Sequence, residues 1–432
     1  MAALLSLAPF GAPARAQQWT GSPAADSATA ARAAWARASG ALRAGLEDSA
    51  RAEIARAATA WPTQPAYVWA SVRLAARAHD TVAALDWLRT YANLGLGHEL
   101  SSDTTVARLI GLPAFAKARD AIAANARPLV RSRRLLAFGD SSFWAEGVDA
   151  DPRTGHFFVS SIRHRTIADV ARDGTARELW PRDRAGLGAI FGVRVDTIRN
   201  VLWATTSGVP QEEGYVPGDS GVAALLEIRP ADGSILRRWD LPAAPMGHVL
   251  GDLAVGPRGD VFMTDSNHPT LYRLRSESDT LESITSPLFH SLQGLAPTPD
   301  GRTLYLTDYS HGLLRVDLQS AAVKRVADAA GSTSLDCDGI VWYRGGIVAV
   351  QNGVTPRRIV RFVLDATGDR IERVDVVDRN VVVADEPTIG TIAGNEFVYV
   401  ANGQWDKHDD MGRRVPHTEL RPTILLAVPL PH

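Results

Sequence analysis

The clearest pattern in the chain lies between residues 291 and 327, where short apolar runs alternate with polar turns. The first two runs are separated by Pro299, Asp300 and Gly301, which favour a tight turn because Pro fixes φ and Gly tolerates positive φ. The apolar and β-branched side chains predict four short strands, at 292–296, 303–307, 313–318 and 322–327. Four antiparallel strands within about 40 residues are typical of one blade of a β-propeller.

The same unit recurs along the chain with a constant phase. When each unit is marked just before the opening Gly of its first strand, or its equivalent, the marks are Glu146, Phe191, Asp252, Gln293, Asp338 and Ile389. Their spacings are 45, 61, 41, 45 and 51 residues, and the longest spacing contains the insertion 207–221. Repetition at this period predicts an all-β six-bladed β-propeller over residues 134–430. An irregular all-β sandwich would not explain the fixed phase of turn, strand and polar end.

The ring is expected to close between the two ends of the propeller. The last unit lacks one outer strand, whereas residues 134–138 form a strand without a unit of their own. Pairing residues 134–138 with 423–428 supplies the missing strand and leaves no open sheet edge at that point.

Residues 24–127 have a different character, since they are rich in Ala, Arg and Leu with apolar positions at helical spacing. Asp80 and Ser102 have the character of N-caps, and Trp61-Pro-Thr-Gln-Pro65 is a helix stop. Helices are expected at 30–44, 49–60, 66–77, 80–94, 102–110 and 113–124. The paired helices resemble tetratricopeptide repeats. We therefore predict a small all-α domain, joined to the propeller by the basic linker 126–134, which would act as a scaffold for a protein partner.

Residues 1–20 combine a short apolar run with Ala14-Arg-Ala16, which fits signal-peptide cleavage before Gln17. They predict a periplasmic or secreted protein, with a disordered Ala- and Pro-rich terminus as the alternative. No later stretch has about 20 consecutive apolar residues, so no membrane span is expected. The net charge of −2 and the lack of a long basic run argue against a nucleic-acid partner. Cys337 is the only cysteine, which excludes an intrachain disulfide.

Propeller geometry predicts where the polar residues of the units converge. The start of each innermost strand and the loop after the second strand lie on one face, around the central mouth. Polar residues occupy most of these positions, at Glu146, Asp252, Gln293, Asp338, Asp265, Asp308, Asn352 and Asn402. Converging carboxylates repel one another, and oxygen ligands of mixed type suit Ca²⁺ or Mg²⁺. No Cys/His cluster points to zinc. For Asp265, Asp308 and Asp317 we favour a turn-capping role instead.

Three motifs resemble the senescence marker protein/gluconolactonase family, which includes regucalcin and luciferin-regenerating enzyme. They are Glu146-Gly followed by Asp151-Pro, the run from Gly294 to Asp308, and Asp338-Gly-Ile. The resemblance covers about residues 135–430 and implies a metal-dependent propeller that hydrolyses lactones. It implies that Glu146 and Asp338 bind a divalent metal, with Ca²⁺ as the expected ion. Gln293 stands where that family has a ligating Asn, and Asp252 stands near the place of a second Asn.

Candidate residues for catalysis and substrate contact lie around the same mouth. Asp252, Gln293 and Asn352 are expected to complete or orient the metal shell. Asp252 is a candidate catalytic residue. His248 and His290 are candidates for proton transfer, because neutral imidazole titrates near neutral pH, although a lone His is more often a surface or hydrogen-bonding residue. Two long loops, 207–220 and 403–412, are expected to rim the pocket. Their residues Tyr215 and Trp405, with Asn402, are the expected contacts to a small-molecule substrate.

Two function classes follow from the sequence. The first is a metal-dependent hydrolase of a lactone or a related ester at the mouth. The second is a non-catalytic propeller that binds a ligand or a protein and is coupled to the helical scaffold, since one fold hosts many functions. The chain has neither a Gly-x-Ser-x-Gly nucleophile elbow nor a Gly-rich phosphate loop, which argues against a serine hydrolase and a nucleotide-binding enzyme.

Overall fold

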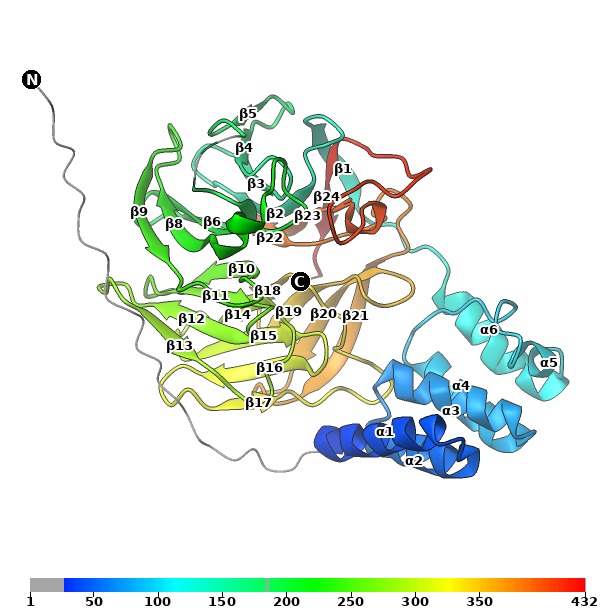
Figure 1. Cartoon of the computed structure of the whole chain (residues 1–432). Coiled ribbons are helices and arrows are strands. Elements are labelled where there is room, and N and C mark those ends of the chain that lie inside the picture. Colours follow the sequence, from blue (N-terminus) through cyan, green and yellow to red (C-terminus); the bar gives the residue numbers. More distant parts are fainter. Residues whose placement is uncertain (1–26, 183, 185, 432) are drawn as a thin grey trace, which may run out of the picture.

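The structure is a computed structural model that describes residues 27–182, 184 and 186–431. The expected signal segment, residues 1–20, lies outside these residues, so export and cleavage before Gln17 stay predictions. Within the described part of the chain, no helix is long and apolar enough to cross a membrane. The chain folds into a helical region followed by a β-propeller, as predicted (Figure 1).

The propeller contains six four-stranded antiparallel sheets among the described residues. Blades 1 to 3 are formed by β2 (Ala145–Ala150), β3 (Phe157–Ser161), β4 (Ile167–Val170), β5 (Ala176–Glu178); β6 (Ala189–Asp196), β7 (Val201–Ser207), β8 (Ala223–Ile228), β9 (Ile235–Asp240); β10 (Leu250–Val255), β11 (Val261–Asp265), β12 (Thr270–Leu274) and β13 (Leu281–Ile284). Blades 4 to 6 are formed by β14 (Leu292–Pro297), β15 (Thr303–Asp308), β16 (Gly312–Asp317), β17 (Val323–Arg325); β18 (Ile340–Tyr343), β19 (Gly346–Gln351), β20 (Arg358–Leu364), β21 (Ile371–Arg379); β22 (Gly390–Ala393), β23 (Glu396–Val400), β24 (Thr423–Pro429) and β1 (Arg133–Phe138).

The ring closes through the first and last strands, which confirms the expected pairing. β1 runs antiparallel to β24, so that Arg134 faces Leu426 and Phe138 faces Thr423. Blade 6 thereby gains its fourth strand from the start of the propeller.

The hydrophobic core lies between neighbouring blades. All six residues of β15 are buried, because the sheets of a propeller cover one another on both faces. Leu306 and Leu314 of blade 4, for example, pack in one cluster with Phe262 and Leu271 of blade 3. Burial on both faces explains why these strands read as continuous apolar runs in the sequence.

The repeated Gly of each unit marks a close approach between blades. A Cβ on Gly147 would lie 2.7 Å from the carbonyl oxygen of Phe191, and one on Gly294 would lie 2.5 Å from that of Asp338. The inner strand also breaks its pairing register here in blades 1 to 4, between 145 and 148, 190 and 193, 250 and 253, and 292 and 295. Such a bulge takes a residue out of the ladder. The phase marks Glu146, Asp252 and Gln293 occupy these bulges.

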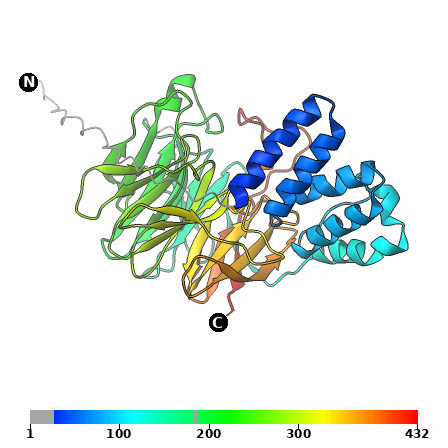
Figure 2. The ribbon, with the colours of Figure 1, turned by 90° about the horizontal axis from the view of Figure 1, so that it is seen from below.

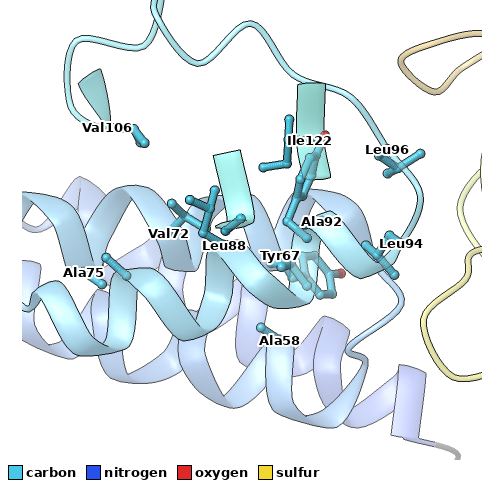
Figure 3. Close-up of a cluster of buried hydrophobic side chains, with 14 of the residues drawn as sticks. Ala58, Tyr67, Val72, Ala75, Leu88, Ala92, Leu94, Leu96, Val106 and Ile122 are labelled. Carbon is cyan, nitrogen blue, oxygen red and sulfur yellow. The ribbon is translucent and has the colours of Figure 1, made fainter. Parts of the chain in front are cut away.

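The helical region consists of paired helices, as expected. Its elements are α1 (Ser27–Arg43), α2 (Glu47–Ala60), α3 (Pro65–Arg77), α4 (Thr81–Asn93), α5 (Ala107–Ile110), a 3₁₀ turn (Pro113–Phe115) and α6 (Ala116–Asn125). Side chains such as Tyr67, Leu88 and Ile122 form its core (Figure 3). Asp80 caps α4 as predicted, since its carboxylate accepts the Ala83 N–H at 3.0 Å.

The predicted helix at 102–110 is wrong in its first half. The structure has turns up to Val106, and α5 begins only at Ala107. The Asp103 carboxylate accepts the N–H of Thr105 at 3.0 Å, a local bond with which Asp favours a turn over a helix.

The helical region packs against the propeller beside blade 5 (Figures 1 and 2). Leu335 and Val354 of the propeller belong to the hydrophobic cluster of the helices. The Arg325 guanidinium lies over the Trp61 ring at 5.0 Å, and the Thr63 hydroxyl donates to Asp328 at 2.6 Å. The two parts therefore share a packed interface.

Candidate functional site

The mouth of the propeller brings together three buried carboxylates from different blades. Glu146, Asp252 and Asp338 are 7%, 2% and 8% exposed. Burial, followed by the negative charge of Asp338, raises the pKa of Glu146 well above its usual value. Burial also raises the pKa of Asp338 to about 7 and that of Asp252 to about 6. The mouth thus concentrates negative charge in a poorly hydrated space.

Glu146 is held by the long loop of blade 6. The Trp405 indole N–H, in the 3₁₀ turn Trp405–Lys407, donates to Glu146 Oε2 at 2.7 Å. The same indole stacks on Phe191, with ring centroids 6.3 Å apart. One side of the carboxylate therefore has an aromatic wall. Glu386, which the sequence reasoning missed, also raises the pKa of Glu146 through its charge.

Asp338 is held by a short hydrogen-bond chain. The Asn352 amide donates to Asp338 Oδ2 at 2.8 Å and to the Pro387 carbonyl at 3.0 Å. The Tyr309 hydroxyl donates to Asn352 Oδ1 at 3.1 Å, which fixes the orientation of the amide. Burial and the charges of Asp338 and Glu146 raise the pKa of Tyr309. In this arrangement Asn352 presents N–H groups, not its oxygen, to Asp338.

Asp252 differs from the other two carboxylates because it has a cationic partner. Arg194 Nη2 lies 3.2 Å from Asp252 Oδ1, and the Arg194 side chain is only 11% exposed. Gln293 donates weakly to Ser291 Oγ, at 3.3 Å. The mouth thus contains one carboxylate paired with an Arg, Asp252, and two without a salt bridge among the described residues, Glu146 and Asp338.

The donor set of Glu146 and Asp338 fits a hard divalent cation. Each carboxylate has one oxygen bonded to an N–H group, and neither forms an ion pair with Lys or Arg in the described part of the chain. Carboxylate oxygen is the preferred donor for Ca²⁺. Asp252 fits less well, since Arg194 already compensates its charge. No group of three or more His, Cys, Asp or Glu residues is arranged around one metal position within the described ranges.

The two candidate histidines are both engaged in hydrogen bonds. His248 Nδ1 donates to Asp265 at 2.5 Å and Nε2 donates to the Pro242 carbonyl at 2.9 Å. Burial lowers the pKa of His248, but these two bonds outweigh it and leave the pKa raised. His290 Nε2 accepts from Arg32 of helix α1 at 3.1 Å, so it faces the helical region. Both ring nitrogens of His248 and Nε2 of His290 are therefore engaged in hydrogen bonds.

The two long loops meet over the mouth face. Gln211 of the first loop donates to the Asp410 carbonyl of the second at 3.1 Å. Tyr215 is half-buried on the first loop, which ends in the 3₁₀ turn Pro217–Gly221. The side chain of Asn402 is engaged with the backbone at the end of its own loop, because it donates to the Pro422 carbonyl at 3.0 Å and accepts the Ile424 N–H at 2.8 Å.

A set of buried hydroxyls around the mouth escaped the sequence reasoning. Each donates to a backbone carbonyl near the mouth of a neighbouring blade: Ser160 to Phe191, Thr205 to Leu250, Thr264 to Gln293, Thr307 to Asp338 and Thr388 to Glu146. The first four lie 12 or 14 residues after a phase mark, at the same place in the second strand. That periodic Ser/Thr was the signal available in the sequence.

The turn-capping interpretation of three aspartates is confirmed. Asp308 accepts backbone N–H groups of four residues, including His290 at 2.7 Å and Ser310 at 2.8 Å. Asp265 accepts the N–H of Asn267 at 3.1 Å, and Asp317 accepts that of Ser320 at 2.8 Å.

No protein-family model matches the chain, and no curated protein matches it. Similar chains occur among solved structures. A gluconolactonase from Xanthomonas campestris is 16% identical, with 71% of this chain and 93% of that chain covered and a TM-score of 0.45. The calcium-binding protein regucalcin from Agrobacterium tumefaciens is 17% identical, with coverages of 70% and 94% and a TM-score of 0.43. A catalytically inactive virginiamycin B lyase from Staphylococcus aureus is 12% identical, with coverages of 70% and 100% and a TM-score of 0.44. Because these proteins differ in function, the likeness selects none.

Proposed function

We propose that the mouth of the propeller binds a divalent cation, Ca²⁺, and hydrolyses a lactone or a related ester. The observation that carries this proposal is the pair Glu146 and Asp338. Both carboxylates are buried, both have raised pKa values, and neither has a basic partner in the described part of the chain. Buried carboxylates of this kind are costly unless a cation or protons neutralise them.

The residues around Glu146 and Asp338 have separate roles in this proposal. Glu146 and Asp338 would hold the cation, and Trp405 and Asn352 keep their carboxylates in place through N–H bonds. A bound cation would polarise the substrate carbonyl. The stacked rings of Trp405 and Phe191 offer an apolar wall to the ring of a lactone.

Asp252 is the base that this ring supports best. With a pKa of about 6 it is ionised at pH 7 and can accept a proton on a carboxylate oxygen. The Arg194 guanidinium at 3.2 Å keeps that carboxylate in one orientation. His248 is less suited, because both of its ring nitrogens form hydrogen bonds, to Asp265 and to the Pro242 carbonyl. His290 is less suited because its Nε2 accepts from Arg32 of the helical region.

A non-catalytic binding propeller is the second candidate. The Arg194–Asp252 ion pair favours it, since a ring with one compensated carboxylate can hold a polar ligand without turnover.

A panel of aliphatic and aromatic lactones, assayed with Ca²⁺ and with chelator, separates the two functions. The hydrolase predicts Ca²⁺-dependent turnover that Glu146→Gln and Asp252→Asn abolish and that Asp317→Asn, at a capped turn, retains. Saturable lactone binding without turnover would favour the binding propeller.

A further inference from the structure

The helical region contacts the two propeller segments that carry Asp338 and Asn352. Leu335, three residues before Asp338, is 1% exposed and packs in the helical core. Val354, two residues after Asn352, packs in the same core. The Gly97 N–H, just beyond α4, donates to the Thr355 carbonyl at 2.8 Å. Both halves of the hydrogen-bonded pair at the mouth are thus anchored next to the helices.

Arg358, the first residue of β20, lies buried at the centre of this contact. Its side chain forms no salt bridge among the described residues, and the residue is 3% exposed. Nε donates to Gln351 Oε1 at 2.6 Å, and Nη1 donates to the Gly95 carbonyl at 3.1 Å. Burial lowers the pKa of Arg358 to about 10. A buried guanidinium with only neutral acceptors is costly, so its retention calls for a compensating interaction.

Helix α4 supplies that interaction. Gly95 lies two residues beyond the end of α4 at Asn93, where the helix dipole is negative and carbonyls lack helical partners. Gly95 has φ +71°, and a Cβ there would lie 3.2 Å from Arg358 Nη1. Glycine therefore allows the guanidinium to approach the carbonyl closely.

Gln351 extends the contact from Arg358 to the segment before Asp338. Its amide donates to the carbonyls of Thr333 at 3.0 Å and Leu335 at 2.7 Å. Gln351 also precedes Asn352 directly. One continuous set of bonds therefore runs from the end of α4 through Arg358 to both segments.

We infer that Arg358 is a positioning residue, which uses the end of helix α4 to fix Asp338 and Asn352 at the mouth. The helical region then has a role in the geometry of the site itself. This inference rests on the proposed function for its consequence on cation binding, but the positioning can be measured without it.

Amide hydrogen exchange of the full chain tests the positioning directly. Arg358→Gln is expected to raise local exchange about tenfold or more in segments 331–338 and 350–356. The matched control is Arg361→Gln, because Arg361 lies on the same strand, is 8% exposed and donates to the Arg344 carbonyl of the propeller at 3.2 Å instead of to the helical region. Equal local exchange in the two variants, at matched global stability, would overturn the inference.

Calcium titration of the same variants tests the consequence. Arg358→Gln is expected to weaken Ca²⁺ binding about 10- to 100-fold, as for other groups that orient metal ligands, while Arg361→Gln leaves it unchanged. If Arg358→Gln does not fold, Arg358→Lys replaces it, since Lys keeps the charge but cannot bond Gln351 and Gly95 together; unchanged exchange in that variant would count against the inference. Absence of Ca²⁺ binding in the unmodified protein would sink the proposed function, and the exchange data alone would then decide the role of Arg358.

Discussion

Glu146 and Asp338, the two carboxylates at the mouth without a salt bridge in the described part of the chain, should destabilise the metal-free protein when they are ionised. We predict that Asp338→Asn stabilises the metal-free protein at pH 8. The substitution removes the buried charge. It keeps an oxygen that can accept a hydrogen bond from the Asn352 amide, which in the unmodified protein lies 2.8 Å from Asp338 Oδ2.

The magnitude follows from the pKa of Asp338, which is about 7 against 3.8 for an unperturbed Asp. A pKa difference of one corresponds to about 1.4 kcal/mol, so the ionised carboxylate costs up to about 4 kcal/mol. Because the folded-state pKa is raised, the stabilising contribution is present below pH 4 and is lost as the pH rises through 7. The free energy of unfolding of the metal-free protein should therefore fall between pH 5 and pH 8, and less steeply in Asp338→Asn.

Urea unfolding in the presence of chelator at pH 5, 6, 7 and 8 measures both effects. Asp252→Asn is the matched contrast. At pH 8 it also removes a buried carboxylate with a raised pKa, of about 6, but it leaves the buried Arg194 guanidinium without its partner, so it should stabilise the protein less than Asp338→Asn does or destabilise it. The reasoning fails if Asp338→Asn is destabilised at pH 8, or if Asp252→Asn stabilises the protein as much as Asp338→Asn does.

Three further outcomes are expected. Thr307→Val should destabilise the protein by about 2–4 kcal/mol in urea unfolding, because it strips a donor and an acceptor from two buried backbone groups; Thr307→Ser should recover most of the loss. Deletion of residues 1–127 should leave a propeller that unfolds cooperatively, but its free energy of unfolding should fall by on the order of 3–6 kcal/mol, since Leu335 and Val354 become exposed. Non-cooperative melting would refute an independent propeller. Burial and the charges of Arg32 and His311 lower the pKa of His290, so the hydrogen bond between Arg32 and His290 is stable above the unfolded pKa of about 6.5 and weakens as the pH falls. Proteolysis of α1 should therefore accelerate at pH 5, and Arg32→Gln should abolish that acceleration.

The phase of the propeller could be predicted from the sequence because it rests on local requirements that repeat. Gly follows every phase mark except Asp252, where Leu253 stands, and it is required where blades approach to within van der Waals contact, as at Gly147 and Gly294. The Pro, Asp and Gly of the turns act within a few residues. The closing strand followed from counting, since one unit lacked a strand and one strand lacked a unit.

The partners of the site residues could not be predicted in the same way. Trp405 reaches Glu146 from 259 positions away, and Arg194 reaches Asp252 from 58 positions away, across different blades. The choice of partner depends on loop paths and rotamers, which leave no periodic trace in the sequence. The sequence placed Asp252 at the mouth but could not reveal that Arg194 would compensate its charge.

The most direct test of the metal site is a calorimetric titration of the chelator-treated protein with Ca²⁺, alongside Glu146→Gln. The proposed site predicts saturable binding with one ion per chain, and a melting temperature that rises with Ca²⁺, since an excess of about 100 times Kd adds roughly 2.7 kcal/mol. Glu146→Gln should bind far more weakly and lose most of the thermal response, while the fold persists because the hydrophobic clusters between neighbouring blades do not include Glu146. Equal melting temperatures of the unmodified protein with Ca²⁺ and with chelator, together with no binding heat, would contradict a cation site formed by Glu146 and Asp338.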